Sequence, residues 1–140
     1  MKKQFLFSLF LAAFFIISSC TKPESLPNNS NPSTIVKQGT WRVTLFNDNG
    51  TIKTSNFSGY NFTFGSTGVV TVSGPSSVTG SWSSFTDSGK QKFDMNFGAI
   101  TNFNQLNEDW EVTSQSASRI ELKHVSGGDG GISYLTIEKN

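Results

Sequence analysis

The sequence predicts an all-β domain, an eight-stranded antiparallel up-and-down β-barrel of minimal size without a C-terminal helix. Three observations predict it. Apolar and polar residues alternate with a period of two in eight short segments, as in a sheet with one buried face. Turn-forming residues separate these segments, and beyond residue 19 no window keeps helical spacing for three turns. Eight antiparallel strands can close on themselves and remove both sheet edges, with an open sandwich as the alternative.

The first 19 residues have the three regions of a secretory signal peptide. Lys2 and Lys3 precede a 13-residue apolar run at positions 5–17, and the small residues Ser18 and Ser19 follow it. A membrane-spanning helix is the alternative. However, 13 residues of helix rise only about 20 Å, which is less than the roughly 30 Å of a hydrocarbon core. The sequence therefore predicts a signal peptide over residues 1–19.

Residues 20–37 are predicted to form a flexible tether, because they contain three prolines, several Asn and Ser, and few apolar residues. Cys20 is the only cysteine, so a disulfide within the chain is excluded. The barrel domain is expected over residues 38–140.

The eight predicted strands follow in order along this domain. They cover positions 41–45, 60–64, 69–73, 78–83, 93–97, 110–114, 120–124 and 135–137. In the first strand, Trp41, Val43 and Leu45 alternate with polar residues and are expected to face inward. The predicted inward aromatic residues are Trp41, Phe62, Phe64, Trp82, Phe93, Phe97 and Trp110.

Most connections are short and rich in Gly, Asn, Asp and Ser, which suits antiparallel hairpins. Two connections are longer, at positions 51–59 and 98–109. Each is expected to hold a helical turn, with Phe57 in the first and Phe103 and Leu106 in the second packing against the barrel.

The segment Ile17-Ser18-Ser19-Cys20 resembles a bacterial lipoprotein signal, in which a small-residue box ends in a cysteine. The resemblance implies cleavage between Ser19 and Cys20, followed by attachment of diacylglycerol and a further acyl chain to Cys20. Ordinary cleavage that leaves a free thiol is the alternative. Thr21 follows the cysteine, with no aspartate there, which by resemblance to Gram-negative lipoproteins implies an outer-membrane location with the face left open.

Gly39-Thr40-Trp41 matches the G-x-W signature of lipocalins, in which the tryptophan packs across the closed end of the barrel. Gly80-Ser81-Trp82 repeats the pattern. With the lipoprotein-like start and the segments at 106–110 and 126–128, residues 38–140 resemble the lipocalin-like (calycin-type) domains of small Gram-negative bacterial lipoproteins, whose function is largely uncharacterised. The resemblance implies that Gly39, Trp41, Gly80 and Trp82 close the barrel. Larger lipocalins cover the tryptophan with a cation, and here both Lys139 and Arg119 are candidates.

The charged residues exclude several classes of function. From Cys20 onward there are nine Lys and Arg against ten Asp and Glu, so no basic face for nucleic acid is expected. His124 is the only histidine, and no nucleophile elbow accompanies it. Because the predicted acylation would consume Cys20, no cysteine remains to build a usual zinc set with it. Asp109 and Glu111 share one strand face at about 7 Å, compatible with paired-carboxylate hydrolysis, but a solvated outer face is the favoured interpretation. We therefore predict no catalytic residues, no metal site and no cofactor.

Two hypotheses for function remain. The favoured one is a lipid-anchored, non-enzymatic protein of the cell envelope that binds a small hydrophobic or amphipathic molecule at the barrel mouth, lined by Val70, Val72, Val78 and Trp110. Its partners would be the membrane, through Cys20, and this small apolar ligand.

The alternative is an envelope protein-interaction module, an adaptor or inhibitor, with a filled barrel. It would bind a partner protein through the long loops at 51–59 and 98–109, with Phe57, Phe85 or Phe103 as apolar anchors.

Overall fold

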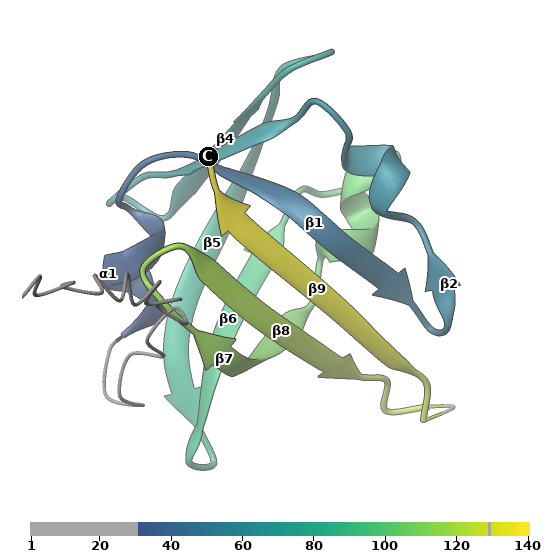
Figure 1. Ribbon diagram of the computed structural model, residues 1–140. Helices are drawn as coiled ribbons and strands as arrows, with labels where there is room; N and C mark the ends of the chain where they lie inside the picture. Colours follow the sequence, from purple (N-terminus) through teal and green to yellow (C-terminus); the bar gives the residue numbers. More distant parts are fainter. Residues whose placement is uncertain (1–30, 129) are drawn as a thin grey trace, which may run out of the picture.

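The computed structural model describes residues 31–128 and 130–140 (Figure 1). The predicted signal peptide, Cys20 and the first part of the predicted tether lie outside the described residues. The elements in chain order are α1 (Pro32–Val36), β1 (Trp41–Asp48), β2 (Thr51–Ile52), η1 (Thr54–Phe57), β3 (Asn61–Phe64), β4 (Val69–Ser73), β5 (Val78–Asp87), β6 (Lys90–Asn96), η2 (Phe103–Leu106), β7 (Asp109–Gln115), β8 (Arg119–Val125) and β9 (Ile132–Lys139).

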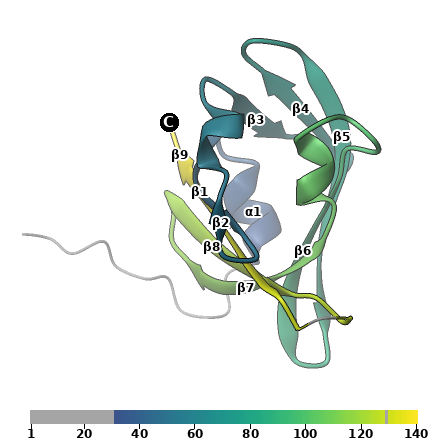
Figure 2. The same cartoon turned by 90° about the vertical axis from the view of Figure 1, so that its right-hand side faces the viewer.

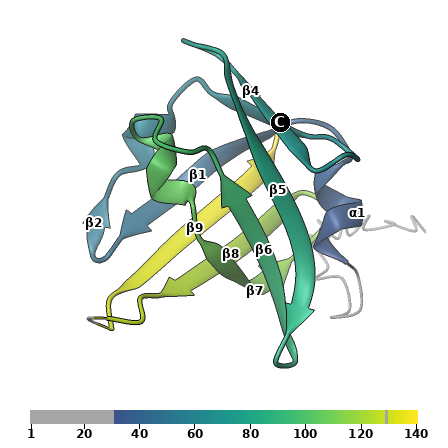
Figure 3. The same ribbon diagram turned by 180° about the vertical axis from the view of Figure 1, so that it is seen from behind.

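The strands form a closed antiparallel barrel, which confirms the predicted fold class. Consecutive strands from β3 to β9 pair with one another, β1 pairs with β3, and β9 returns to pair with β1. The ring therefore has eight strands, and the two-residue β2 adds to the end of β1. Figure 1 shows β8, β9 and β1 side by side, and Figure 3 shows the long β5 and β6 on the opposite wall. No helix follows β9 in the described part of the chain.

Each of the eight predicted strands overlaps one observed strand, and only the short β2 was not predicted. Both long connections contain the expected helical turn, η1 in the first and η2 in the second. The side chains of Phe57, Phe103 and Leu106 are buried, so both turns pack against the barrel as predicted.

The inward assignment of Leu45 is wrong. The pairing of β1 with β9 shifts by one residue between Val43 and Leu45, which is a β-bulge. Because one extra residue reverses the alternation of side chains, Leu45 lies on the outer face and Phe46 faces the core. Leu45 is 36% exposed, whereas Phe46 is completely buried.

Aromatic side chains fill the barrel, and all seven that were predicted to face inward are buried. Most of their contacts are edge-to-face, for example Phe64 against Trp82 with ring centroids 5.5 Å apart and Phe46 against Trp110 at 6.4 Å. The interior is therefore a packed core, the arrangement expected when bulky residues fill an eight-stranded barrel.

Short helical segments cover both ends of the barrel. Helix α1 lies at the end where β1 begins, and the indole Nε1 of Trp41 donates a hydrogen bond to the carbonyl oxygen of Val36 at 2.9 Å. In Figure 2 the turns η1 (blue-green) and η2 (green) lie at the near end, with α1 fainter at the far end. The rings of Phe57 and Phe103 meet edge-to-face between the two turns, with centroids 5.6 Å apart.

Helix α1 also corrects the predicted boundary between tether and domain. The tether was expected to continue to residue 37, yet Ile35 and Val36 are buried against the barrel core. The side chain of Asn31 caps the helix by accepting a hydrogen bond from the backbone N–H of Ser33, and Pro32 occupies a first-turn position. The apolar residues Ile35 and Val36 are the only indication of this burial in the sequence. Two apolar residues are too few to show a helical period.

Candidate functional site

The residues predicted to line a ligand-binding mouth lie in the packed core. Val70, Val72 and Trp110 have no exposed surface, and Val78 has 7%. The indole Nε1 of Trp110 donates a hydrogen bond to the carbonyl oxygen of Leu106 at 3.1 Å, which fixes the ring beneath η2. These side chains offer almost no surface to a ligand.

The residues predicted to close the barrel lie at two places. Trp41 is buried beneath α1, and Trp82 stacks on Phe93 with ring centroids 5.6 Å apart. The indole Nε1 of Trp82 donates a hydrogen bond to the carbonyl oxygen of Gly65, in the turn between β3 and β4, at 3.0 Å.

The basic residue nearest to Trp41 in register is Lys139. The two residues pair directly between β1 and β9, so their side chains lie on the same face of the sheet. Gly39 has a φ of +99°, which favours glycine, and Cε of Lys139 would lie 2.9 Å from a Cβ at this position. Arg119 instead forms ion pairs with Glu121 and Glu138.

The long loops do not present the predicted aromatic anchors. Phe57 and Phe103 are 1% and 3% exposed, because η1 and η2 direct them into the end of the barrel. Phe85 is 44% exposed on β5, away from both loops. The proposed anchoring through Phe57 and Phe103 is therefore wrong.

Exposed apolar side chains gather instead on the outside of the barrel wall formed by β8, β9, β1 and β2. Of the eight large hydrophobic residues that are exposed in the described structure, five lie on this wall. We call this surface the outer apolar face, and its members are Leu45, Ile52, Val125, Ile132 and Tyr134.

Strand pairing connects these residues on one outer face, on which the polar side chains of Asn47 and Lys123 also lie. Val125 pairs with Ile132, Tyr134 pairs with Asn47, and Asn47 pairs with Ile52. Directly paired side chains on one face lie about 5 Å apart, and diagonal neighbours about 7–8 Å. The face therefore extends over four strands at the end of the barrel opposite α1 (Figure 1). Sequence reasoning missed it because the bulge in β1 turns Leu45 outward and because the other four residues lie outside the predicted strands.

A polar hollow lies near the same end of the barrel, with a volume of about 190 Å³. Its lining comes from the end of β1 and the turn after it, the residue before β7, the end of β8, the turn that follows and the start of β9. The lining residues are Asp48, Asn49, Glu108, His124, Ser126, Gly131 and Ser133. Hydrogen bonds connect part of this wall, since Ser133 Oγ donates to Asp48 Oδ1 at 3.3 Å and accepts from the backbone N–H of Asn49 at 3.2 Å.

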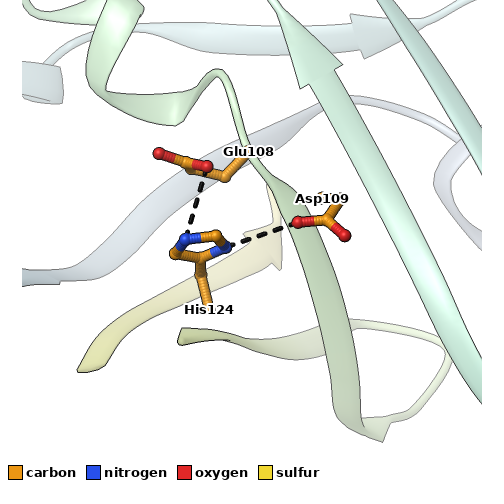
Figure 4. A group of neighbouring side chains, drawn as sticks. All are labelled: Glu108, Asp109 and His124. Carbon is orange, nitrogen blue, oxygen red and sulfur yellow. Dashed lines mark ion pairs between the residues drawn. The ribbon is translucent and has the colours of Figure 1, made fainter. Parts of the chain in front are cut away.

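His124 lies at the border of this hollow, between two carboxylates (Figure 4). Its Nε2 is 3.4 Å from Glu108 Oε2, and its Nδ1 is 3.5 Å from Asp109 Oδ1. Trp110, which lies on β7 next to Asp109, contacts the imidazole edge-to-face with centroids 6.0 Å apart. The side chain of His124 is only 18% exposed.

Both acidic residues of β7, Asp109 and Glu111, also pair with lysines of β6. Lys90 Nζ lies 2.8 Å from Glu111 Oε2, and its hydrogen bond lowers the pKa of Glu111, with further lowering by the charges of neighbouring lysines. Lys92 Nζ lies 3.4 Å from Asp109 Oδ2. Partial burial, followed by the charge of Asp109, raises the pKa of Asp94 on β6. The bond to Lys90 makes Glu111 part of an ion-paired outer surface.

A second hollow of about 450 Å³ lies at the α1 end of the barrel, around the turn between β7 and β8. Its lining includes three serines together with Arg119, Glu138 and Lys139.

Among the described residues, no helix is both long enough and apolar enough to cross a lipid bilayer.

Comparison with known proteins gives the fold alone. No protein-family model matches the sequence, and no protein of curated function matches it. The crystal structure of a DUF4847 family protein from Bacteroides vulgatus ATCC 8482 is similar, with a TM-score of 0.52 and 19% sequence identity, over 78% of this chain and 97% of that one. This neighbour and the eight-stranded antiparallel barrel fit a lipocalin-like fold.

Proposed function

We propose that this protein is a lipid-anchored, non-enzymatic binding module of the bacterial cell envelope that binds a partner protein through the outer apolar face. The observation that carries the proposal is the concentration of exposed apolar side chains on one wall of the barrel. Exposed apolar side chains that gather into one large patch, unlike those scattered singly, mark interaction surfaces. Tyr134, at the centre of the patch, is a residue type that is enriched in interface hot spots.

The packing of the barrel favours this function over the carriage of a small ligand. The aromatic side chains interlock across the core, from Phe64 and Trp82 to Phe46 and Trp110. A carrier of the usual kind needs an apolar cavity that encloses most of its ligand. The hollow beside His124 is instead lined mainly by polar and charged side chains.

The position of the lipid anchor favours a protein partner over the bilayer itself. Acylation of Cys20 would attach the chain to the membrane, and eleven residues separate Cys20 from Pro32 at the α1 end of the barrel. The outer apolar face lies at the other end of β1, whose 8 residues extend about 25 Å. The face would therefore lie farther from the anchor than the α1 end does, in a membrane that we propose to be the outer membrane.

Site-specific photocrosslinking in the native bacterium tests this function. A photoreactive amino acid replaces Tyr134 on the outer apolar face or, as the matched control, Phe85. The control residue has a similar exposed fraction, 44% against 42%, but lies on β5 at the other wall. We expect one discrete protein adduct from position 134 and none from position 85. Substitution of Ile52 and Val125 by serine should abolish the adduct and leave the circular dichroism spectrum unchanged.

The result that would overturn the proposal is equal crosslinking at the two positions, or adducts with lipid alone at position 134. Native mass spectrometry of the purified protein distinguishes this function from the competing one, the carriage of a small apolar ligand. A co-purified lipid-like mass that persists in a variant lacking the apolar face would support a carrier.

A further inference from the structure

The structure brings together a side-chain set that sequence spacing did not reveal. Glu108 and Asp109 precede and begin β7, and His124 lies near the end of the neighbouring β8. One potential ligand atom from each of the three residues lies within 4.8 Å of the other two. A lone histidine cannot form the usual zinc sets once Cys20 is acylated, so the sequence predicted no metal site. A histidine combined with carboxylates is a different donor set, and both are ordinary zinc ligands.

The separation of His124 and Glu108 suits two ligands of one ion. Zinc binds imidazole nitrogen and carboxylate oxygen at about 2.0–2.2 Å in tetrahedral geometry, which places two ligand atoms about 3.3 Å apart. The observed distance between His124 Nε2 and Glu108 Oε2 is 3.4 Å. Both residues also line the polar hollow, which has room for the water molecules that would complete the coordination.

Asp109 would act as a positioning residue on the other side of the imidazole. Its Oδ1 faces Nδ1 of His124 at 3.5 Å, so a proton held on Nδ1 leaves the lone pair of Nε2 directed at Glu108 and the hollow (Figure 4). Metal-bound histidines commonly have a carboxylate in this outer position. Lys92 Nζ, 3.4 Å from Asp109 Oδ2, makes the Asp109 side unfavourable for a second positive charge.

The charges around the imidazole also favour binding of a cation on its Glu108 side and not on its Asp109 side. Within residues 31–128 and 130–140, Glu108 makes no ion pair with a lysine or arginine, and its charged-group contact is His124. Asp48 lines the same hollow, but Lys53 and Ser133 hold its carboxylate. When His124 is neutral, the carboxylate of Glu108 therefore has no paired cation at the hollow.

We propose that the polar hollow binds a divalent transition-metal ion of the zinc type, with His124 Nε2 and the Glu108 carboxylate as protein ligands and Asp109 as the residue that orients the imidazole. The imidazole nitrogen selects zinc-like ions over calcium and magnesium, which prefer oxygen ligands alone. With two protein ligands, the site is expected to be weaker than structural zinc sites. This site is independent of the protein-binding face, because it uses none of the five residues of that face.

Isothermal titration calorimetry with Zn²⁺ tests the site in the chain from Cys20 onward, in which Cys20→Ser removes a competing thiol. We expect one equivalent of Zn²⁺ to bind with a micromolar dissociation constant and no heat from Ca²⁺ or Mg²⁺. His124→Gln and Glu108→Gln should each weaken binding at least roughly tenfold, and Asp109→Asn by about tenfold. Glu111→Gln is the matched control, because this carboxylate lies on the same strand but pairs with Lys90, and it should bind as the parent does.

Fluorescence locates the bound ion. Co²⁺ at His124 should quench Trp110, whose ring centroid lies 6.0 Å from that of the imidazole. If His124→Gln fails to fold, Glu108→Gln carries the test, because the side chain of Glu108 is 43% exposed and outside the core. The proposal is overturned if the parent chain binds no Zn²⁺ at millimolar concentration, or if Glu108→Gln binds Zn²⁺ as tightly as Glu111→Gln does.

Discussion

Substitution of Gly80 by alanine is the sharpest test of the packing in the barrel wall. Gly80 lies on β5 between β4 and β6. A Cβ atom at this position would lie 2.5 Å from the carbonyl oxygen of Asn96 and 2.6 Å from Cδ1 of Phe97, where ordinary contact begins at 3.4 Å. The overlap with the backbone oxygen is therefore 0.9 Å, the difference between 3.4 and 2.5 Å. The backbone at Asn96 must therefore shift, and the ring of Phe97 must move as well.

The expected cost follows from two opposing terms. Forcing an extra methyl group into a packed core costs about 1–3 kcal/mol, and the upper part of this range applies because one obstacle is backbone. Replacing glycine by alanine also restricts the unfolded chain, which stabilises the native state by about 0.4–1 kcal/mol. We expect Gly80→Ala to lower the free energy of unfolding by about 1–2.5 kcal/mol.

Urea unfolding followed by circular dichroism measures this change. Gly127→Ala is the control, because no heavy atom lies within 4 Å of the corresponding Cβ, and its effect should remain within about 0.5 kcal/mol. Adding Phe97→Leu to Gly80→Ala should cost less than the sum of the single changes, since the smaller side chain relieves part of the overlap. A stability of Gly80→Ala equal to that of the parent would refute the close approach of β5 and β6.

Three further predictions follow from the same structure. Trp41→Ala should destabilise the domain by roughly 3–5 kcal/mol in urea unfolding, because a fully buried aromatic ring is lost; a loss below about 1 kcal/mol would contradict its role beneath α1. Asp94→Asn should raise the melting temperature at pH 7, because the raised pKa of Asp94 means that ionisation costs native-state stability as pH rises through it. This advantage should shrink as pH falls through the raised pKa and should be absent below pH 3.8, the ordinary pKa of the group; an unchanged difference would argue against ionisation of Asp94 as the cause. Cys20→Ser should leave the far-ultraviolet circular dichroism of the domain unchanged and release the protein from membranes on fractionation; retention in the membrane fraction would refute acylation.

The sequence by itself determined the fold class and most of the core. Alternation with a period of two marks which residues share a face, and strands such as β4 keep this alternation in the structure, with Val70 and Val72 buried between exposed neighbours. Gly- and Asn-rich turns mark where strands end. These are local properties of the chain, so a single sequence is enough to read them.

Tertiary structure alone decided the surfaces proposed to carry function. The bulge in β1 depends on the pairing of β1 with β9 and reverses the direction of Leu45, which no alternation rule in β1 foretells. The tether boundary shifted for a similar reason, because Ile35 and Val36 acquire their burial from a barrel end built by distant strands.

The candidate metal site has the same origin. Glu108 and His124 are separated by 15 intervening residues in the sequence and become neighbours only because β7 and β8 pair. Sequence spacing identifies ligands that lie on one turn or one strand, whereas the register between strands fixes which residues of different strands meet. That register follows from the packing of the whole core, and the core exists only once the barrel has closed.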